Sequence, residues 1–311
     1  MKKVLITGVA GFIGSHVAKR FLIEGYEVFG VDDLSTGNIQ NVPERVSFIE
    51  GNLSEIKVIQ SLPSESLVII HLAGQSSGEI SFDDPILDLN KNVVSTLRLI
   101  EYGIANRAPL MLYGSSMSVY GNTATPNPSE DAICNPLSCY GIGKLMSEKY
   151  LSIYADRLPS ISMRMFNVYG PGQDLSNLRQ GMISIYLAQA IANSKIIIKG
   201  STQRFRDFIY VSDVAEIYLK AAKTKTVQSN ILNVGTGKKT TVHDLIQLIC
   251  NKLPNILYTV DGQTPGDQSG IFADCSRLER QLGYNNYTNL NDGLDMFITW
   301  ALKDRFIENS S

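Results

Sequence analysis

Residues 3–14 read KVLITGVAGFIG, an apolar run that passes into three glycines, Gly8, Gly11 and Gly14. The run predicts a buried strand, and the pattern after it predicts an amphipathic helix. Gly8 permits a tight turn, Gly11 lets the backbone approach a phosphate, and Gly14 allows the helix to pack closely on the strand. The amino terminus of the helix then faces the phosphate. This stretch therefore predicts a phosphate-binding turn between a strand and a helix.

A carboxylate follows at the end of the next apolar run, where Asp32 stands 18 residues after Gly14. It can accept hydrogen bonds from both ribose hydroxyls of a dinucleotide, and it repels a 2′-phosphate. Glycines alone are a weak signal, because a turn without a ligand can carry them too. With Asp32 beside them, and with no Arg or Lys at positions 31–37, they predict that the cofactor is NAD rather than NADP.

Short apolar runs alternate with helical patterns through the first half of the chain. Continuous apolar strands separated by helices indicate a parallel sheet covered on both faces. Right-handed crossovers then give an α/β, doubly wound (Rossmann) fold. The runs predict strands at 3–7, 27–31, 46–49, 67–72, 110–114 and 161–166, and helices at 12–24, at 85–106 and from Tyr140 to about 156.

The alternation ends after Val168, where Asn, Gly, Gln and short elements dominate. Residues 207–210 and 231–234 look like strands that return to the sheet. We therefore expect a smaller, discontinuous α/β substrate-binding region over the carboxyl ends of the strands. The predicted division is an NAD-binding domain of residues 1–168 plus about 207–240, and a substrate-binding region of residues 169–206 and 241–311.

The composition excludes several classes of function. The chain has 311 residues, 44% of them hydrophobic, which is enough for one large or two modest domains. The net charge is −2 and basic residues are scattered, so neither nucleic acid nor a membrane is expected as a partner. Glycines interrupt the first apolar run, which argues against a signal peptide, and no run of about 18 apolar residues predicts a membrane span. Four cysteines without zinc or CxxC spacing indicate reduced thiols, a cytoplasmic location and no metal site: Cys134, Cys139, Cys250 and Cys275.

Tyr140 and Lys144 stand four residues apart in CYGIGK, residues 139–144. One turn of helix places both side chains on the same face, so an ammonium can lie beside a phenol. A nearby positive charge favours the phenolate and lowers the pKa of a tyrosine from its usual value near 10. A phenol tuned in this way can take a proton from an alcohol or return one to a ketone.

Two serines, Ser115 and Ser116, follow the predicted strand at 110–114 and so stand at its carboxyl end. Doubly wound folds bind their ligands there. A hydroxyl at Ser116 can bond the substrate oxygen while Tyr140 exchanges its proton. The alternative for Ser116 alone is a helix cap or turn serine. Its place in the sheet favours the catalytic interpretation.

The motifs as a set resemble the extended short-chain dehydrogenase/reductases, in particular the nucleotide-sugar epimerase/dehydratase family and within it the UDP-glucose 4-epimerases. The motifs that carry the resemblance are TGVAGFIGSHV (7–17), VDDLSTGN (31–38), HLAGQ (71–75), SSMSVYG (115–121), YGIGK (140–144), RMFNVYGPGQ (164–173) and RFRDFIYVSDVA (204–215). TPGDQ at 264–268 and ADCSRLERQLGY at 273–284 extend it towards the carboxyl terminus.

The resemblance implies roles for particular residues. The implied catalytic residues are Ser116, Tyr140 and Lys144. The implied NAD contacts are Gly8, Gly11, Phe12, Ile13, Gly14, Asp32, Asn38, Asn52, Leu53, Leu72, Ala73, Gly74, Gln75, Asn92, Ser115, Tyr140, Lys144 and Phe166. The implied substrate contacts are Ser116, Ser118, Tyr140, Asn167, Arg206, whose guanidinium would grip a diphosphate, and Asp267.

The chain departs from the family pattern at three places. Asn52 and Leu53 replace an acidic residue near the adenine, Thr264 replaces a second diphosphate arginine, and Ile271 replaces an aromatic residue near the ligand. Arg204 is a candidate to compensate for the missing arginine. These departures leave open which nucleotide and which sugar the protein binds.

The segment Ser116-Met117-Ser118 carries no carboxylate, whereas the family's dehydratases and decarboxylases use one there. The resemblance therefore implies epimerisation at C4 of a nucleotide-diphosphate hexose, through a 4-keto intermediate and with NAD retained. A 4-keto-sugar reductase that uses the same three residues stays open, as does a non-catalytic NAD-binding module. A homodimer through the helix at 85–106 and the Tyr140 helix is also implied, with apolar candidates Leu97, Ile100, Leu145 and Tyr154.

Overall fold

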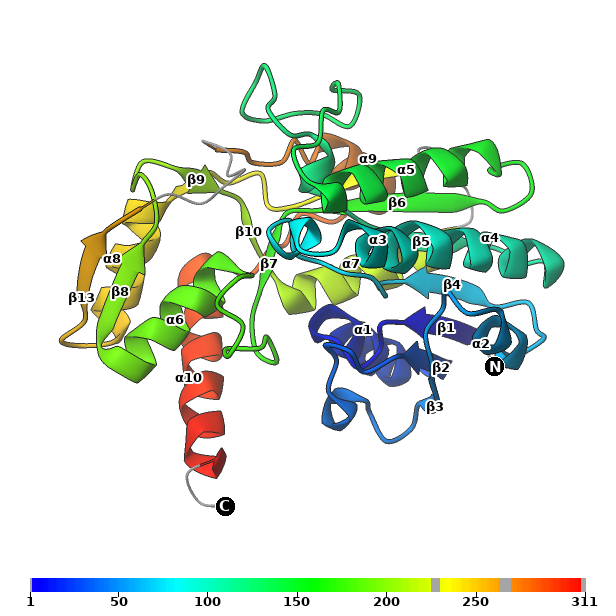
Figure 1. Cartoon of the computed structure of the whole chain (residues 1–311), viewed down its shortest axis with the longest axis horizontal. Coiled ribbons are helices and arrows are strands. Elements are labelled where there is room, and N and C mark those ends of the chain that lie inside the picture. The colour runs from blue at the N-terminus through cyan, green and yellow to red at the C-terminus, as the bar shows by residue number, and fades with distance from the viewer. Residues whose placement is uncertain (1, 225–229, 263–269, 309–311) are drawn as a thin grey trace.

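A sheet of parallel strands forms the centre of the protein (Figure 1). In this computed structural model, which describes residues 2–224, 230–262 and 270–308, the strand order is β11-β6-β5-β4-β1-β2-β3. Because the order reverses between β1 and β4, a crevice opens outside their carboxyl ends. The strands are β1 (Lys3–Thr7), β2 (Glu27–Asp32), β3 (Ser47–Glu50), β4 (Val68–His71), β5 (Met111–Ser116), β6 (Ser160–Met165) and β11 (Ile231–Val234).

Helices cover both faces of this sheet, as its continuous apolar strands predict. On β1, Val4 and Ile6 pack into one apolar cluster, and Leu5 between them packs into the opposite one. The first cluster includes residues of α1 (Phe12–Ile23) and α7 (Val211–Lys223), and the second includes residues of α2 (Ile56–Ser61), α4 (Ser95–Ala105) and α5 (Cys139–Ile153). The predicted doubly wound fold is confirmed.

The helix expected over 85–106 is present but changes pitch inside. It consists of α3 (Pro85–Leu89), a π-helical turn η3 (Asn90–Val94) and α4. Asp84 begins it, because its side chain accepts a hydrogen bond of 2.9 Å from Leu87 N and Pro85 occupies the first turn. Turns of this wider kind occur mostly at functional positions, and this one carries Asn92.

Short helical turns connect the larger elements around the crevice. They are the 3₁₀ turns η1 (Ile39–Asn41), η2 (Ile80–Phe82) and η4 (Met117–Val119). Among the residues described, no helix is both long enough and apolar enough to cross a membrane.

A second region gathers beside the sheet, with α6, α8 and α10 at one end of the molecule (Figure 1). It has an apolar cluster of its own, which includes Leu187, Ile196, Ile249 and Phe297. Its helices are α6 (Met182–Asn193), α8 (Val242–Lys252) and α10 (Leu290–Glu308), whereas α9 (Ser276–Leu282) packs into the cluster of the main sheet. Its short strands pair as β7 (Asn167–Tyr169) with β10 (Phe208–Tyr210), β8 (Lys195–Ile198) with β13 (Leu257–Val260), and β9 (Phe205–Arg206) with β12 (Thr240–Thr241).

One strand prediction is wrong. Residues 231–234 join the main sheet as β11, but residues 208–210 pair with β7 outside it. The chain leaves the sheet at Phe166, directly after β6, and Tyr169 and Phe208 then pack in the cluster of the second region. The division of the chain into two domains stays a prediction, with β10 on the side of the second region.

Candidate active site

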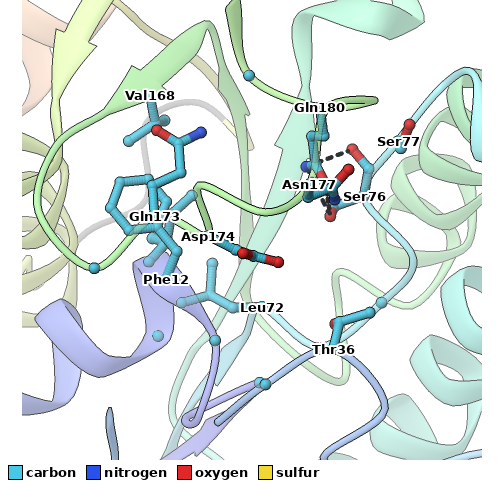
Figure 2. Close-up of a pocket in the computed structure, with 18 of the residues that line it drawn as sticks. Phe12, Thr36, Leu72, Ser76, Ser77, Val168, Gln173, Asp174, Asn177 and Gln180 are labelled. Carbon is cyan, nitrogen blue, oxygen red and sulfur yellow. Dashed lines mark hydrogen bonds between the residues drawn. The ribbon is translucent and has the colours of Figure 1, made fainter. Parts of the chain in front are cut away.

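An open cleft of about 1740 Å³ lies at the carboxyl ends of the strands. Its walls come from the glycine turn after β1, from the ends of β2, β4 and β5, and from residues 171–193 of the second region. Figure 2 shows Phe12 and Leu72 from the sheet side facing Gln173 and Asp174 from the second region. Clefts for one drug-sized ligand measure about 300–1,000 Å³, so this one has room for a dinucleotide and a second ligand.

The glycine turn leaves no room for a side chain at Gly8 or at Gly14. Gly8 has φ +69°, in the left-handed region. A Cβ atom at Gly8 would lie 2.7 Å from Ala73 N, and one at Gly14 would lie 1.9 Å from Gly8 O. Gly11 caps α1 without a side chain, so the first amides of this helix face the cleft unobstructed. The glycine turn and the amino terminus of α1 therefore fit the diphosphate of a dinucleotide.

Asp32 is held rigidly at the end of β2. Its Oδ2 accepts a hydrogen bond of 3.0 Å from Ala10 N, and its Oδ1 accepts one of 2.9 Å from Leu34 N. Burial raises the pKa of this carboxyl, and the two backbone hydrogen bonds oppose that rise. Each oxygen keeps a lone pair that can accept from a ribose hydroxyl. The position and the chemistry fit NAD.

Lys91 was missed by the sequence reasoning, which searched for cations only at positions 31–37. Its Nζ lies 3.2 Å from Asp33 Oδ2 and donates a hydrogen bond to Ser35 Oγ. The π-helical turn brings this ammonium to the end of β2, where a 2′-phosphate would bind. Asp33 compensates its charge. The only signal in the sequence was the neighbouring Asn92, which the family resemblance had already identified as a site residue.

Tyr140 and Lys144 lie on the same face of α5, as predicted. Ser138 begins the helix by accepting a hydrogen bond of 3.1 Å from Gly141 N. Lys144 Nζ lies 5.6 Å from the centre of the Tyr140 ring and 5.0 Å from that of Tyr113. The Tyr140 hydroxyl shares a hydrogen bond with Ser116.

Ser116 caps a turn and is also hydrogen-bonded to Tyr140. Besides bonding Tyr140, its Oγ caps η4 by accepting a hydrogen bond of 3.2 Å from Ser118 N. It also donates one of 3.1 Å to Ser118 Oγ. The three hydroxyls therefore form a short chain along the floor of the cleft, which can pass a proton between a ligand oxygen and Tyr140.

The expected lowering of the Tyr140 pKa is wrong for this protein by itself. Burial raises the pKa of Tyr140 to about 12, although the Ser116 hydrogen bond opposes the rise. Burial also lowers the pKa of Lys144 to about 8. Desolvation disfavours both charged forms, and it outweighs the attraction that the Tyr-Lys spacing suggested.

Ser115 points away from the cleft. Its Oγ donates a hydrogen bond to Glu148 of α5, which also accepts 3.0 Å and 2.7 Å bonds from Arg164 of β6. Only the backbone of Ser115 can therefore meet a ligand. Its side chain helps to fasten the Tyr140 helix to the sheet.

Two loops meet at the rim of the cleft (Figure 2). Gln180 Nε2 donates hydrogen bonds of 3.1 Å and 2.9 Å to Ser76. Beside this contact, Arg179 pairs with Glu79 at 3.0 Å and with Asp83 at 2.6 Å. The loop after β4 and the loop after β7 are thus joined across the opening.

Most of the predicted site residues come together in this cleft. Asn92 lies behind it, and Arg206 is buried and does not line it. Ile271 is buried in a small cluster with Tyr120, also away from the cleft, and Asp267 and Thr264 lie outside the described residues. The predicted residues that line the cleft are Gly8, Gly11, Phe12, Ile13, Gly14, Asp32, Asn38, Asn52, Leu53, Leu72, Ala73, Gly74, Gln75, Ser115, Ser116, Ser118, Tyr140, Lys144, Phe166 and Asn167.

Several known proteins resemble this chain in sequence and in architecture. Residues 4–235 match the model of the NAD dependent epimerase/dehydratase family. A putative UDP-glucose 4-epimerase of Methanocaldococcus jannaschii is 32% identical over 305 residues, which cover 96% of this chain and 97% of that protein. The UDP-glucose 4-epimerase of Thermotoga maritima, crystallised with UDP-glucose, superposes with a TM-score of 0.91 at 30% identity, over 97% of this chain and 99% of that one. The UDP-glucose 4-epimerase of Thermus thermophilus, in complex with NAD, gives a TM-score of 0.85 at 28% identity, over 96% of this chain and 98% of that one.

Proposed function

This chain belongs to the NAD dependent epimerase/dehydratase family, and from that premise we propose that it is an NAD-dependent 4-epimerase of a nucleotide-diphosphate hexose. The relatives in the comparison favour a uridine diphosphate sugar. The observation that carries the proposal is the buried Tyr140, bonded to Ser116, with Lys144 beside it on α5. All three line the same cleft as the glycine turn.

The reaction follows from the positions of these groups. The glycine turn and Asp32 would hold NAD, whose nicotinamide would supply hydride transfer from C4 of the sugar and back to its opposite face. Tyr140 accepts the proton of the C4 hydroxyl and later returns it, while Ser116 bonds the same oxygen. Lys144 stabilises the phenolate electrostatically. Asp32 and the glycine turn hold the dinucleotide through the cycle, so no net oxidation occurs.

The absence of a carboxylate beside Ser116 narrows the chemistry. Elimination of water from the sugar needs an additional acid and base near C5 and C6. In the segment 116–118, where the family's dehydratases and decarboxylases use a carboxylate, this chain has Ser118, which is bonded to Ser116. Asn167 lines the same cleft, which supports its proposed contact with the substrate. Arg206 does not line it, so a grip on the diphosphate would require its side chain to move.

NMR of product mixtures tests the proposal. Purified protein is incubated with UDP-, dTDP- and GDP-hexoses, with no added cofactor. The expected result is equilibration at C4 of one sugar, which identifies both reaction and substrate. A strict requirement for added NADH or NADPH would show a 4-keto-sugar reductase instead. If no substrate is converted and Tyr140→Phe leaves the cellular phenotype unchanged, the non-catalytic module is supported.

We also propose a homodimer through α3, α4 and α5. The predicted candidates Ile100 and Tyr154 pack against the apolar cluster under these helices instead of facing outwards. Other apolar residues of this surface are exposed and support the proposal: Ile86, Leu87, Leu89, Ile142, Met146 and Ile153. Size-exclusion chromatography with light scattering, on the wild type and on Ile142→Glu, checks it. A cytoplasmic location stays a prediction.

A further inference from the structure

Asp88 is a buried carboxylate that the proposed reaction does not use. It lies near the end of α3 with only 2% of its surface exposed. One helical turn later, Asn92 Nδ2 donates a hydrogen bond of 3.0 Å to Asp88 Oδ1. Carboxylates are almost never fully buried unless they are paired, so the position calls for a counter-ion.

Helix α5 passes close to Asp88 because Gly143 has no side chain. A Cβ atom at Gly143 would lie 3.4 Å from Asp88 Oδ2 and 3.4 Å from Asn92 Cβ. Gly143 directly precedes Lys144, so this close approach places the backbone of α5 beside Lys144 against the carboxylate. Among the charges that act on Lys144, that of Asp88 is the strongest, ahead of Glu148.

Asn92 joins the two helices around this pair. Its Nδ2 also donates a hydrogen bond of 3.0 Å to Gln75 O, and Ser147 Oγ of α5 donates one of 2.9 Å to Asn92 O. Its Oδ1 is buried and has no hydrogen-bond partner among the described residues. A Cβ atom at Gly74 would lie 2.4 Å from this Oδ1 and 3.6 Å from Lys144 Nζ, so both atoms border the same small polar space beside the cleft.

We propose, on the basis of the proposed function, that Asp88 is a positioning residue whose buried carboxylate keeps the Lys144 ammonium charged and in place beside Tyr140. The same carboxylate attracts an ammonium and repels a phenolate. It therefore sets the charge state of both groups together, without contact with the substrate.

The pKa values of the three groups agree with this arrangement. Burial raises the pKa of Asp88 to about 6, and the Asn92 hydrogen bond and Lys144 oppose that rise. Burial lowers the pKa of Lys144 to about 8, which Asp88 opposes, and Asp88 adds to the raised pKa of Tyr140. The other titratable groups that act on Lys144 or Tyr140 are His71 of β4, Tyr113 of β5, Glu148 of α5 and Tyr218 of α7.

The first test is the pH profile of kcat for Asp88→Asn. Asparagine has the shape of aspartate and keeps an acceptor for Asn92, but it carries no charge. Without the carboxylate, the pKa values of both Lys144 and Tyr140 fall. Both limbs of the profile are therefore expected to move to lower pH by about one unit. A residue with a merely structural role would change the height of the profile and leave its position unchanged.

A second readout needs no substrate. The ultraviolet titration of tyrosinate in the wild type, minus that in Tyr140→Phe, isolates the ionisation of Tyr140. The same difference measured in the Asp88→Asn background is expected at lower pH. This result stands even if the natural reaction differs from the proposed epimerisation, so failure of one proposal is distinguishable from failure of the other.

Asp84→Asn is the matched control. Asp84 is exposed, caps the same helix, and begins it equally well as asparagine. Its pH profile and tyrosinate titration are expected to overlay those of the wild type. The proposal is overturned if Asp88→Asn shifts neither readout, or shifts them no more than Asp84→Asn. Should Asp88→Asn unfold, Asp88→Ser provides a second uncharged variant with an acceptor for Asn92, and the same outcomes apply to it.

Discussion

Tyr140 and Lys144 share one face of α5, yet burial moves their pKa values in opposite directions. The pKa of the phenol rises to about 12 and that of the ammonium falls to about 8. In the chain alone, Tyr140 is therefore protonated at neutral pH. A positive charge placed beside the phenol favours its ionised form. We therefore expect a cationic ring bound in the cleft to lower the pKa of Tyr140 and so to favour its proposed role as proton acceptor.

We expect Tyr140→Phe to lower kcat by about 10² to 10⁴-fold, the usual contribution of a general acid-base group. The substitution keeps the buried ring and removes only the hydroxyl, so Tm and the content of bound NAD should stay unchanged. Steady-state kinetics and the absorbance of the released cofactor check this. Tyr150→Phe, on the same helix, is the control. Wild-type rates in Tyr140→Phe would contradict the assignment.

We expect the alkaline limb of the pH dependence of kcat to reflect Lys144. Because its pKa in the folded protein is about 8, its ammonium is lost as the pH rises through that value. We expect kcat to fall about tenfold per pH unit above this limb. Arginine stays charged over the same range, so any residual activity of Lys144→Arg should show no such fall. A wild-type rate that stays level from pH 7 to 10 would exclude this role.

At the scale of secondary structure, an ion pair fastens α5, which carries Tyr140 and Lys144, to the sheet. Arg164 of β6 binds both carboxylate oxygens of Glu148 on α5, and its NH1 donates a hydrogen bond of 3.1 Å to Glu130 O. The arginine also stacks over Tyr120, with 4.8 Å between its Cζ and the ring centre. The packing of α5 on β5 and β6 therefore keeps Tyr140 within hydrogen-bond reach of Ser116, which the proposed reaction requires.

Arg164→Leu leaves the buried Glu148 carboxylate without its positively charged partner. Loss of one partner of a buried pair costs about 3–5 kcal/mol in unfolding free energy. We expect a loss of this size in urea denaturation, and partial recovery when Glu148→Leu is added. Lys149→Ala, an exposed neighbour on α5, should change stability by less than about 0.5 kcal/mol. Equal losses in Arg164→Leu and Lys149→Ala would refute the role of the pair.

At the scale of the whole molecule, the cleft lies between the parallel sheet and the second region. The loops at 76–83 and 171–181 come from opposite sides and meet through Arg179 and Gln180. Exposed ion pairs stabilise a structure only weakly. These contacts can therefore break and re-form at little cost when a ligand enters the cleft.

Arg179→Ala removes both ion pairs at the rim. We expect KM for the nucleotide sugar to rise by about 2- to 10-fold, with kcat and Tm nearly unchanged, because Arg179 is exposed and does not line the cleft. Arg98→Ala, which removes the exposed pair with Glu101 at 3.7 Å on α4, is the control. An unchanged KM in Arg179→Ala would show that the rim does not hold the ligand.

Local patterns in the sequence were sufficient for the fold and for the centre of the site. The turn at Gly8 depends on backbone angles that glycine alone adopts readily, and the Tyr140–Lys144 pair depends on the pitch of a single helix. Continuous apolar strands specify a sheet covered on both faces. Each of these properties is set within a few residues, so it can be read without knowledge of the rest of the molecule.

Other properties were decided only when distant segments packed together. Lys91 of the π-helical turn lies beside Asp33 at the end of β2, and Gly143 lets α5 approach Asp88 of α3. Arg206 is buried away from the cleft, although its motif predicted a ligand contact. The pKa values of Tyr140 and Lys144 also depend on burial by the whole fold. Desolvation and charge are sums over all neighbours in space, and a sequence specifies those neighbours only through the tertiary structure.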